Sequence, residues 1–514
     1  MTTDGSAARR IMSASGASWA RIAFTVFAQL ALVPLYLSAW GSETYGAWLL
    51  LQTVWGTITI IDLGHQDYVG NECLRLGATE RGAIGSVIGS ALPMALLIAI
   101  FELGLIWGLT GINDMSGWLH ISESLYEQWT VALLVQAATW LISGSGVALL
   151  VRAASPFGYF PRVAWWSLFY AVTTAAVPGL TVWLAGADLL EASIVSCVVS
   201  AACNLLCFLD LNRRLDLLGL LKEGRPSRAR SFRQLRNSLW LTANGLVGLI
   251  RQQGARLVLA PLTGVAQMAA FSTMRTGANF ALQGLNTVTT PIMPELMRFL
   301  VARDQARTEG AFAVIWLVVC AILSPAIVVL QLGMPTLFPI WTHGKMAFDP
   351  WLFAMLSLAV AVYALAQPAT ATLVGNNRVQ AVFGVGAISA LAATGGMILL
   401  IPVLGIRGAA GALLAAEIVS MVLFVIQARW WFHAHGMRWP MRPFLITLAS
   451  VFAATLGMGM VIVTSGSTAG LGVAIVLLVQ AGIVHRYWRE LPPLVRQRVF
   501  DFCGRYVPAL RRMR

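Results

Sequence analysis

The stretch FSTMRTGANF, residues 271–280, places Arg275 within an apolar segment that we predict to extend over residues 265–293. A segment of this length can cross the ~30 Å hydrocarbon layer of a membrane as a helix. An arginine at bilayer depth costs ~2.5–3.5 kcal/mol on insertion scales, so it is expected to face a helix-bundle interior or a water-filled cavity. The stretch therefore predicts a membrane-spanning helix with one polar face.

The composition of the whole chain agrees with a membrane protein. Of its 514 residues, 58% are hydrophobic and 11% are charged, and the mean hydropathy is +0.74. Apolar runs long enough to span a membrane fill the chain, and we predict about fourteen of them. The predicted fold class is thus an all-α integral membrane protein. The predicted spans are 16–39, 45–63, 83–108, 128–151, 161–185, 190–210, 237–260, 265–293, 310–332, 350–374, 378–402, 407–429, 443–464 and 468–488.

The first apolar run is not typical of a cleaved signal peptide. It begins too far into the chain and carries too much polar character, and no small-residue cleavage site follows it. We expect it to remain in the protein as the first helix.

Positive charge is distributed unevenly among the loops. The chain has 35 Lys and Arg against 22 Asp and Glu, a net charge of +13. If the N-terminus is cytoplasmic, nearly all basic residues fall on the cytoplasmic side, as the positive-inside rule requires. Both termini are therefore expected in the cytoplasm, and anionic lipid headgroups rather than nucleic acid are the expected partners of the basic loops. The opposite side has only Lys345 and Arg407.

A basic segment at residues 211–236 divides the chain. A short internal repeat agrees with this division, because GSETYGAW at 41–48 aligns with GVAQMAAF at 264–271. Two six-helix repeats of equal orientation would place a substrate between them. The predicted parts are an N-terminal lobe (1–210), a cytoplasmic linker (211–236), a C-terminal lobe (237–440), two further helices (441–490) and a basic cytoplasmic tail (491–514).

Polar side chains follow one face of three predicted spans. Arg21 and Gln29 share a face of the first span, and Asn244 and Arg251 share a face of the seventh. Stripes in both predicted lobes imply a shared cationic cavity. Arginine suits a phosphate there, because its planar guanidinium binds two oxygens at once. At ~100° per residue, the stripe of the eighth span covers an arc of roughly 80° and includes Arg275, Asn279, Gln283 and Asn286.

Structural explanations for these charges remain open at the level of sequence. Arg21 lies close enough to the cytoplasmic end of its span to extend to the membrane surface, and Arg256 can serve as an anchor at the outer surface. Arg251 and Arg275 can form ion pairs with Glu102 or Glu417. If those two acids are unpaired, they become candidates for a coupling-ion or proton site.

The sequence gives little support for catalysis. Its only Gly-Lys pair, Gly344-Lys345, lacks the remaining residues of a nucleotide-binding loop. The external loops around 109–127 and 333–349 are too short for the catalytic groups of a membrane ligase or polymerase. The six cysteines have no further ligands at the spacing of a metal site. We therefore expect neither enzymatic activity nor a metal or other cofactor, and we expect transport to depend on an ion gradient or the membrane potential.

Several stretches resemble the Wzx-type O-antigen and polysaccharide flippases. GSETYGAWLLLQTVWGTITIIDLG at 41–64 looks like their second-helix signature, and STMRTGANFALQGLNTVTTPIMPEL at 272–296 is similar to their eighth-helix pattern. GNNRVQA at 375–381 and IRGAAGALLAAE at 406–417 match later helices of that family. The sequence departs from the pattern after Gly64, where His-Gln-Asp replaces an apolar continuation.

The resemblance implies a fold of the multidrug/oligosaccharidyl-lipid/polysaccharide exporter superfamily, with two six-helix lobes, about fourteen helices and alternating access. It also implies a bacterial inner-membrane flippase that moves undecaprenyl-pyrophosphate-linked oligosaccharide units to the periplasmic leaflet for O-antigen, capsule or exopolysaccharide synthesis. A polysaccharide polymerase and assembly proteins are possible partners. We predict that Arg251 and Arg275 bind the pyrophosphate and that Arg21 assists. The predicted hydrogen-bonding residues for sugar or headgroup are Asn279, Gln283, Asn286, Asn244, Gln52 and Gln29.

Three alternatives stay open. A lipid II flippase differs only in its headgroup. A drug or cation exporter of the same superfamily would favour carboxylates in the cavity, whereas the predicted cavity is basic. A membrane ligase or polymerase would require the large external loop that the sequence lacks.

Overall fold

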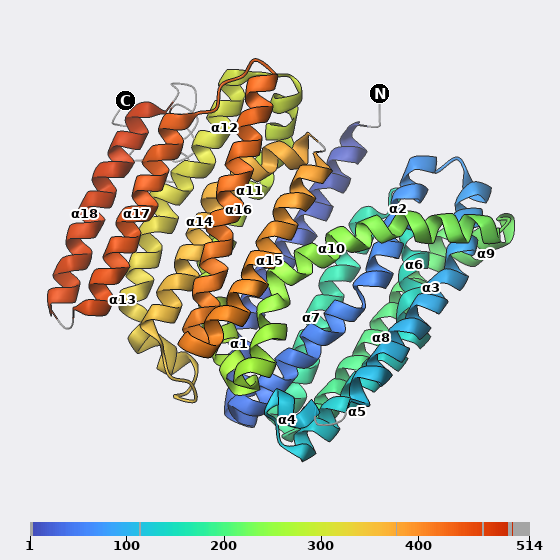
Figure 1. The fold of residues 1–514 in the computed structure, drawn as a ribbon. Coiled ribbons are helices and arrows are strands. Elements are labelled where there is room, and N and C mark those ends of the chain that lie inside the picture. Colours follow the sequence, from blue (N-terminus) through green and yellow to red (C-terminus); the bar gives the residue numbers. More distant parts are fainter. Residues whose placement is uncertain (1–3, 113–114, 377, 465–466, 492–495, 497–514) are drawn as a thin grey trace. The chain divides into compact units, whose positions relative to one another are not determined.

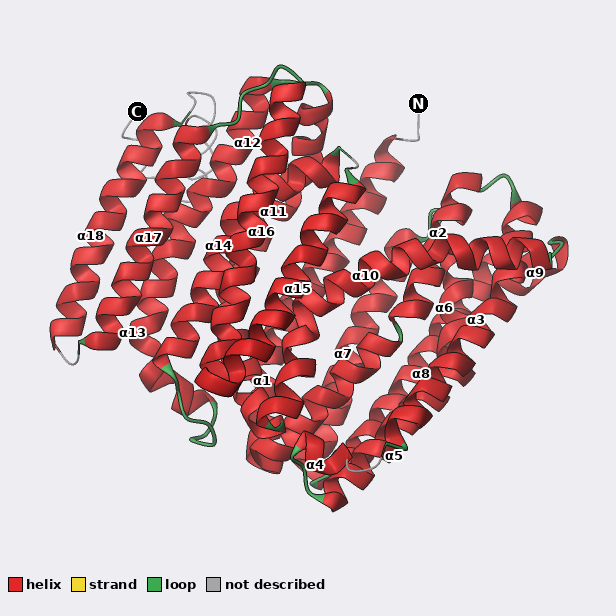
Figure 2. Cartoon of the chain, in the orientation of Figure 1, coloured by secondary structure: helices red, strands yellow, loops and turns green. Residues whose placement is uncertain are grey.

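The computed structural model describes residues 4–112, 115–376, 378–464, 467–491 and 496, and for some of these, among them 4–12 and 284–295, it describes the backbone alone. Within these residues there are eighteen α-helices and two π-helical turns, and no strand (Figure 2). Eleven helical segments are long and apolar enough to cross a membrane. The predicted all-α membrane fold is confirmed.

Every predicted span is found as a helix, although the first two lie largely in one continuous apolar segment. The first apolar segment, Trp19–Ile58, is 40 residues long and covers most of the first and second predicted spans. The seventh and eighth predicted spans correspond to α10 (Arg228–Thr263) and α11 (Val265–Val301), which carry two of the polar stripes and are not among the eleven apolar segments.

The chain forms two compact units, residues up to 269 and residues from 270 onward, which we call unit 1 and unit 2. Helix α11 begins in unit 1 and continues into unit 2 (Figure 1). The other elements of unit 1 are α1 (Asp4–Ile58), α2 (Ile60–Leu76), α3 (Arg81–Thr110), α4 (Met115–Leu119), α5 (Glu123–Thr139), η1 (Trp140–Gly144), α6 (Ser145–Arg152), α7 (Phe160–Ala185), α8 (Leu189–Leu215), α9 (Leu217–Glu223) and α10. Those of unit 2 are α12 (Gln305–Val318), η2 (Val319–Leu323), α13 (Ser324–Trp341), α14 (Pro350–Gly375), α15 (Val379–Leu404), α16 (Ile406–Ala434), α17 (Met441–Val463) and α18 (Ser467–Glu490).

The two glycines that begin the internal repeat have the same unusual backbone conformation. Gly41 bends α1 with φ 75° and ψ −174°, and Gly264 separates α10 from α11 with φ 85° and ψ 159°. Residues with a side chain rarely adopt a positive φ, which explains a glycine at both positions. The two repeats also touch within unit 1, because a Cβ added to Gly46 would lie 2.2 Å from the carbonyl oxygen of Val265.

The basic segment 211–236 is folded onto unit 1. A Cβ added to Gly85 of α3 would lie 2.0 Å from the carbonyl oxygen of Leu220, so α9 and α3 meet backbone to backbone. Ser231 donates to the Ser90 carbonyl at 2.6 Å, and Gln234 Nε2 donates to the Val87 carbonyl at 3.2 Å. The segment predicted as a linker thus contributes buried contacts, while the lobe boundaries stay a prediction.

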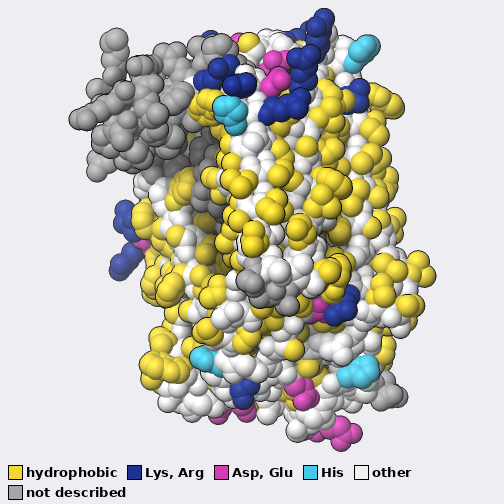
Figure 3. Space-filling model, turned by 90° about the vertical axis from the view of Figure 1, so that its left-hand side faces the viewer, with side chains coloured by type: hydrophobic (Ala, Val, Ile, Leu, Met, Phe, Trp, Pro, Cys, Tyr) yellow, Lys and Arg dark blue, Asp and Glu magenta, His cyan; other side chains and the backbone are white. Residues whose placement is uncertain are grey.

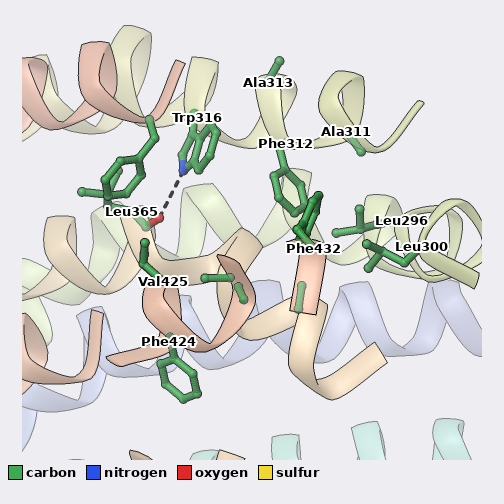
Figure 4. Packing of buried hydrophobic residues seen from close by; sticks show 14 of the residues in the cluster. Leu296, Leu300, Ala311, Phe312, Ala313, Trp316, Leu365, Phe424, Val425 and Phe432 are labelled. Atoms are coloured by element: carbon green, nitrogen blue, oxygen red, sulfur yellow. Dashed lines mark hydrogen bonds between the residues drawn. The ribbon is translucent and has the colours of Figure 1, made fainter. Parts of the chain in front are cut away.

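The core of unit 2 is built from large aromatic side chains. Phe312 and Trp316 of α12 are 0% exposed and pack with Phe432 of α16 (Figure 4). Trp316 Nε1 donates to the Leu365 carbonyl of α14 at 3.1 Å, so the indole N–H is satisfied inside the core. Tyr487 of α18 similarly donates to the Ala313 carbonyl at 2.9 Å. These contacts hold α12, α14, α16 and α18 together.

The outer faces of the helices are apolar. Leu399 and Val403 of α15 are 74% and 79% exposed, and Trp183 of α7 is 69% exposed. Figure 3 shows hydrophobic side chains over the middle of one face, with Lys and Arg gathered at its upper end. Soluble proteins rarely expose such surfaces, whereas a lipid environment requires them.

Candidate functional site

Two carboxylates lie in the interior of unit 1. Asp62 of α2 is 0% exposed and Glu102 of α3 is 1% exposed. They are neighbours, because the backbone N–H of Asp62 donates to Glu102 Oε1 at 3.2 Å. Asp62 Oδ1 and Glu102 Oε2 each lack a hydrogen-bond partner among the described residues. Two buried like charges with unsatisfied oxygens are unfavourable, so the pair is suited to holding a proton or a cation.

The second oxygen of Asp62 is fixed by two donors. Gln66 Nε2 lies 3.0 Å and Trp140 Nε1 2.9 Å from Asp62 Oδ2. Trp140 begins the π-helical turn η1, and a Cβ added to Gly144 at the end of that turn would lie 2.2 Å from its ring. Glycine is therefore needed for the indole to reach its position. Such turns occur often at functional sites, because the extra residue redirects side chains.

A buried histidine lies one residue before Gln66. His65 is 0% exposed, and its Nδ1 lies 3.4 Å from Ser238 Oγ of α10. Ser238 Oγ also donates to the Leu235 carbonyl at 2.8 Å. The other ring nitrogen, Nε2, has no hydrogen-bond partner among the described residues.

Helix α10 covers this cluster by packing closely on α2. A Cβ added to Gly64 would lie 2.2 Å from Thr242 Oγ1, and one added to Gly245 would lie 3.2 Å from the Ile60 side chain. Gly64 belongs to the Asp-Leu-Gly signature, and its role is to let α10 approach. We name Asp62, His65, Gln66, Glu102 and Trp140 the acid cluster. In the part of the chain that the structure describes, no three His, Cys, Asp or Glu side chains are grouped as a metal site.

The predicted substrate residues of unit 1 lie on α1 and α10. Arg21 and Gln29 are exposed on α1, and Asn244 is exposed on α10. Gln52 and Arg251 are half-buried. One contact links the two helices near these residues, because Nη1 of the half-buried Arg256 lies 3.5 Å from Oγ1 of Thr53.

The predicted substrate residues of unit 2 lie on α11. Arg275, Asn279 and Gln283 are half-buried, whereas the side chain of Asn286 lies outside the described residues. Glu417 is buried on α16, with 9% exposure. Each unit thus contributes polar side chains from helices that the sequence predicts to span the membrane, while a cavity shared by both units stays a prediction.

The sequence interpretation identified Glu102 and missed its partners. We considered an arginine as the partner of Glu102, but the structure gives it the backbone of Asp62. Asp62, His65 and Gln66 follow one another at helical spacing in the stretch DLGHQ, which departs from the family pattern after Gly64. That departure was the available signal, because ionisable and amide side chains in a span are expensive unless they have a role.

Comparison with known proteins adds structural relatives only. No protein-family pattern matches the sequence, and no curated protein matches it. An inward-facing MATE family multidrug resistance transporter of the MOP superfamily superposes with a TM-score of 0.65 at 14% identity, covering 79% of this chain and 94% of that chain. The lipid II flippase MurJ, in an inward closed conformation, superposes with a TM-score of 0.63 at 12% identity, covering 93% of this chain and 99% of that chain.

The chain has the MATE and MurJ fold. A MATE family multidrug resistance transporter in an outward-facing conformation agrees less closely, with a TM-score of 0.54 at 14% identity over 83% of this chain and 96% of that chain. These relatives are transporters and a flippase rather than enzymes. Together with the eleven apolar helical segments, this fold supports a multi-pass membrane protein.

Proposed function

We propose that this protein is a flippase for polyprenyl-pyrophosphate-linked oligosaccharides, which it moves from the cytoplasmic to the periplasmic leaflet by alternating access. The observation that carries the proposal is the set of half-buried arginines in membrane-spanning helices of a MATE and MurJ fold, Arg251 of α10 and Arg275 of α11. The relative that covers 93% of the chain is a flippase for a lipid-linked substrate, which supports this class of cargo.

The chemistry of the polar residues fits such a cargo. A guanidinium binds two oxygens of a phosphate at once, and it keeps its charge at any physiological pH. Asn279 and Gln283 follow Arg275 on α11 at intervals of four residues, so they offer amide groups to a headgroup or sugar along the same helix face. The polyprenyl tail would remain in lipid, as the apolar outer faces allow.

The acid cluster provides a way to couple this movement to an ion gradient. Glu102 and Asp62 have unsatisfied oxygens in a buried site, and a proton or cation there would relieve their mutual repulsion. In our proposal, occupation of the pair differs between the inward and outward states, which is the condition for an ion to drive the change. Glu417 of α16 is a second candidate for this role.

Export complementation tests the proposal. The gene is expressed in a bacterium that lacks its polysaccharide flippase, and surface polysaccharide is compared for wild type, Arg275→Ala and Arg275→Lys at matched membrane levels. We expect wild type to restore polysaccharide, Arg275→Ala to lose it, and Arg275→Lys to retain part of it, since lysine keeps the charge but not the two-pronged hydrogen bond. Full export by Arg275→Ala would reject the assigned role of Arg275.

A second host separates the substrate from the function. If wild type fails in the first host, the same comparison is made in a bacterium depleted of its lipid II flippase. Rescue there identifies a peptidoglycan precursor as the cargo. Failure in both hosts with normal expression would contradict the flippase proposal and favour a drug or cation exporter.

A further inference from the structure

A cavity of about 520 Å³ lies at the C-terminal end of α16. Its wall includes Arg429, Trp430 and His433 of α16 and Arg438 and Trp439 of the loop that follows. We call it the α16-end cavity. It belongs entirely to unit 2 and shares no residue with the predicted substrate stripe or the acid cluster. Its chemistry is therefore a separate question from transport through the protein.

The positive charge of this cavity comes from the guanidinium groups of Arg429 and Arg438. Among the residues that the structure describes, neither Arg429 nor Arg438 has a carboxylate oxygen within 4 Å. His433 lies one turn after Arg429 and is exposed. The carbonyl groups at the C-terminus of α16 favour cations at this position. The cavity thus gathers positive charge that is available to an anion.

The position of these side chains is fixed by the fold. The backbone N–H of Arg438 donates to Gln305 Oε1 at 2.9 Å, and its carbonyl accepts from Gln305 Nε2 at 2.7 Å. The Trp439 ring packs against Phe312 and Phe432 at centroid distances of 5.4 and 5.6 Å. The loop is therefore held to α12 and to the aromatic core, so a ligand would meet a formed site.

An apolar path leads from the cavity along the same helix face. Ile426 and Trp430 are one turn apart on α16 and are 40% and 68% exposed, and Ile426 also lines the cavity. Both belong to a span that is apolar enough to cross the membrane. A ligand with an acyl chain beside Ile426 and Trp430 would place its phosphate among the arginines. Indole rings next to basic residues are typical of the membrane interface.

A second cavity of similar size differs from the α16-end cavity in one respect, which is that its arginine has a carboxylate partner. It also measures about 520 Å³, lies in unit 1, and is lined by Trp165, Trp166 and Arg162. There, however, Arg162 donates to both oxygens of Asp210 at 2.5 and 2.6 Å. Asp210 already compensates the charge of Arg162. The two cavities are therefore similar in volume and in aromatic lining, but only the α16-end cavity has arginine charge available to an anion.

We propose that the α16-end cavity binds the phosphate headgroup of an anionic membrane lipid. The arginines would contact the phosphate, and Ile426 and Trp430 would contact the acyl chain. The Arg162 cavity, whose arginine is occupied by Asp210, would bind such a lipid weakly or not at all. This proposal does not depend on the substrate of the transporter.

The test uses the purified full-length protein in neutral detergent, titrated with phosphatidylglycerol or phosphatidylcholine and observed by native mass spectrometry. We expect wild type to prefer phosphatidylglycerol, and Arg429→Gln and Arg438→Gln to weaken that binding about fivefold each, since one basic residue contributes ~1 kcal/mol to an anionic headgroup. Arg162→Gln is the matched control and should bind like wild type. Thermal unfolding of each variant verifies that it is folded.

Two results would overturn the proposal. If the double variant Arg429→Gln, Arg438→Gln is folded and binds phosphatidylglycerol like wild type, the cavity is not the lipid site. If inorganic phosphate at equal concentration displaces phosphatidylglycerol from wild type, the site recognises a soluble anion and the acyl-chain contact is wrong. Persistence of the lipid in the presence of inorganic phosphate supports the proposal.

Discussion

The two π-helical turns of this protein have opposite surroundings. In unit 1, η1 directs Trp140 to the carboxylate of Asp62, at 2.9 Å. In unit 2, η2 places Val319, Cys320 and Leu323 in an apolar core, all with 0 or 1% exposure. The same backbone irregularity therefore serves a polar site in one unit and close packing in the other. The difference teaches that the neighbours of an irregular turn decide its role.

A second contrast is between two buried clusters, the acid cluster of unit 1 and the aromatic cluster around Trp316 of unit 2. Unit 1 buries Asp62, His65, Gln66 and Glu102, and three of their polar atoms have no hydrogen-bond partner among the described residues. Around Trp316, unit 2 buries aromatic rings, and the Trp316 indole N–H has a carbonyl partner, whereas Trp439 Nε1 has none among the described residues. Unsatisfied buried groups reduce stability, so they persist where they have a function. Substitutions should accordingly affect transport at the acid cluster and stability around Trp316.

The largest effect is expected from replacing both acids of unit 1 by amides. Asp62→Asn with Glu102→Gln keeps the shape of the side chains and removes the two charges. We expect export to fall at least about tenfold in the complementation assay, and the unfolding temperature to stay the same or rise, because buried uncompensated charge is lost. Undiminished export at matched protein levels would contradict the coupling role and would not bear on the arginines.

The second effect concerns the core of unit 2. Trp316→Ala removes a fully buried ring and leaves the Leu365 carbonyl without its donor, which should destabilise the protein by about 3–5 kcal/mol. Detergent or thermal unfolding of the purified protein measures the loss. Trp316→Phe serves as the control and should destabilise less. Export per folded molecule should remain unchanged. A loss of export without a loss of stability would contradict a purely structural role for Trp316.

The third effect tests how closely α10 covers the acid cluster. Gly64→Ala would bring a Cβ to 2.2 Å from Thr242 Oγ1 and force α2 and α10 apart, at a cost of about 1–3 kcal/mol. Gly56→Ala is the matched control, since nothing lies within 4 Å of its added Cβ. Unfolding of both variants is compared, and equal stability would show that the contact at Gly64 is less tight than described.

The smallest effect should come from the indole of the first π-helical turn. Trp140→Phe keeps an aromatic ring and removes the donor to Asp62, which should destabilise the protein by about 1 kcal/mol. Cys320→Ala within the second turn is the comparison, because it removes a buried side chain of the other unit. We expect only Trp140→Phe to change the dependence of export on external pH. A similar change in both variants would point to a general packing defect.

The fold was predictable from sequence because a membrane imposes strong rules. Apolar runs predicted every span, including those that became α10 and α11, although these two helices carry polar stripes and are not among the eleven apolar segments of the structure. The aligned glycines Gly41 and Gly264 share a positive φ, as a repeat at the same turn requires. These are local properties that a sequence carries directly.

The acid cluster was only partly predictable, because its members meet through tertiary contacts. Asp62 and Glu102 are 40 residues apart, and Trp140 reaches Asp62 across 78 residues by means of a π-helical turn. Sequence patterns predict which residues share a face of a regular helix. They do not predict the extra residue of a π-helical turn, which changes the direction of the side chains around it. The polar residues after Gly64 indicated that something unusual was present, but not which side chains completed it.

The cover over the acid cluster also has a consequence for the order of synthesis. His65 meets Ser238 across 173 residues, and Gly64 meets Thr242. During translation the polar face of α2 therefore emerges long before the helix that encloses it. Until residues near 240 have been made, this face must be sheltered by the insertion machinery or by temporary partners, so unit 1 cannot reach its final packing until α10 has been inserted.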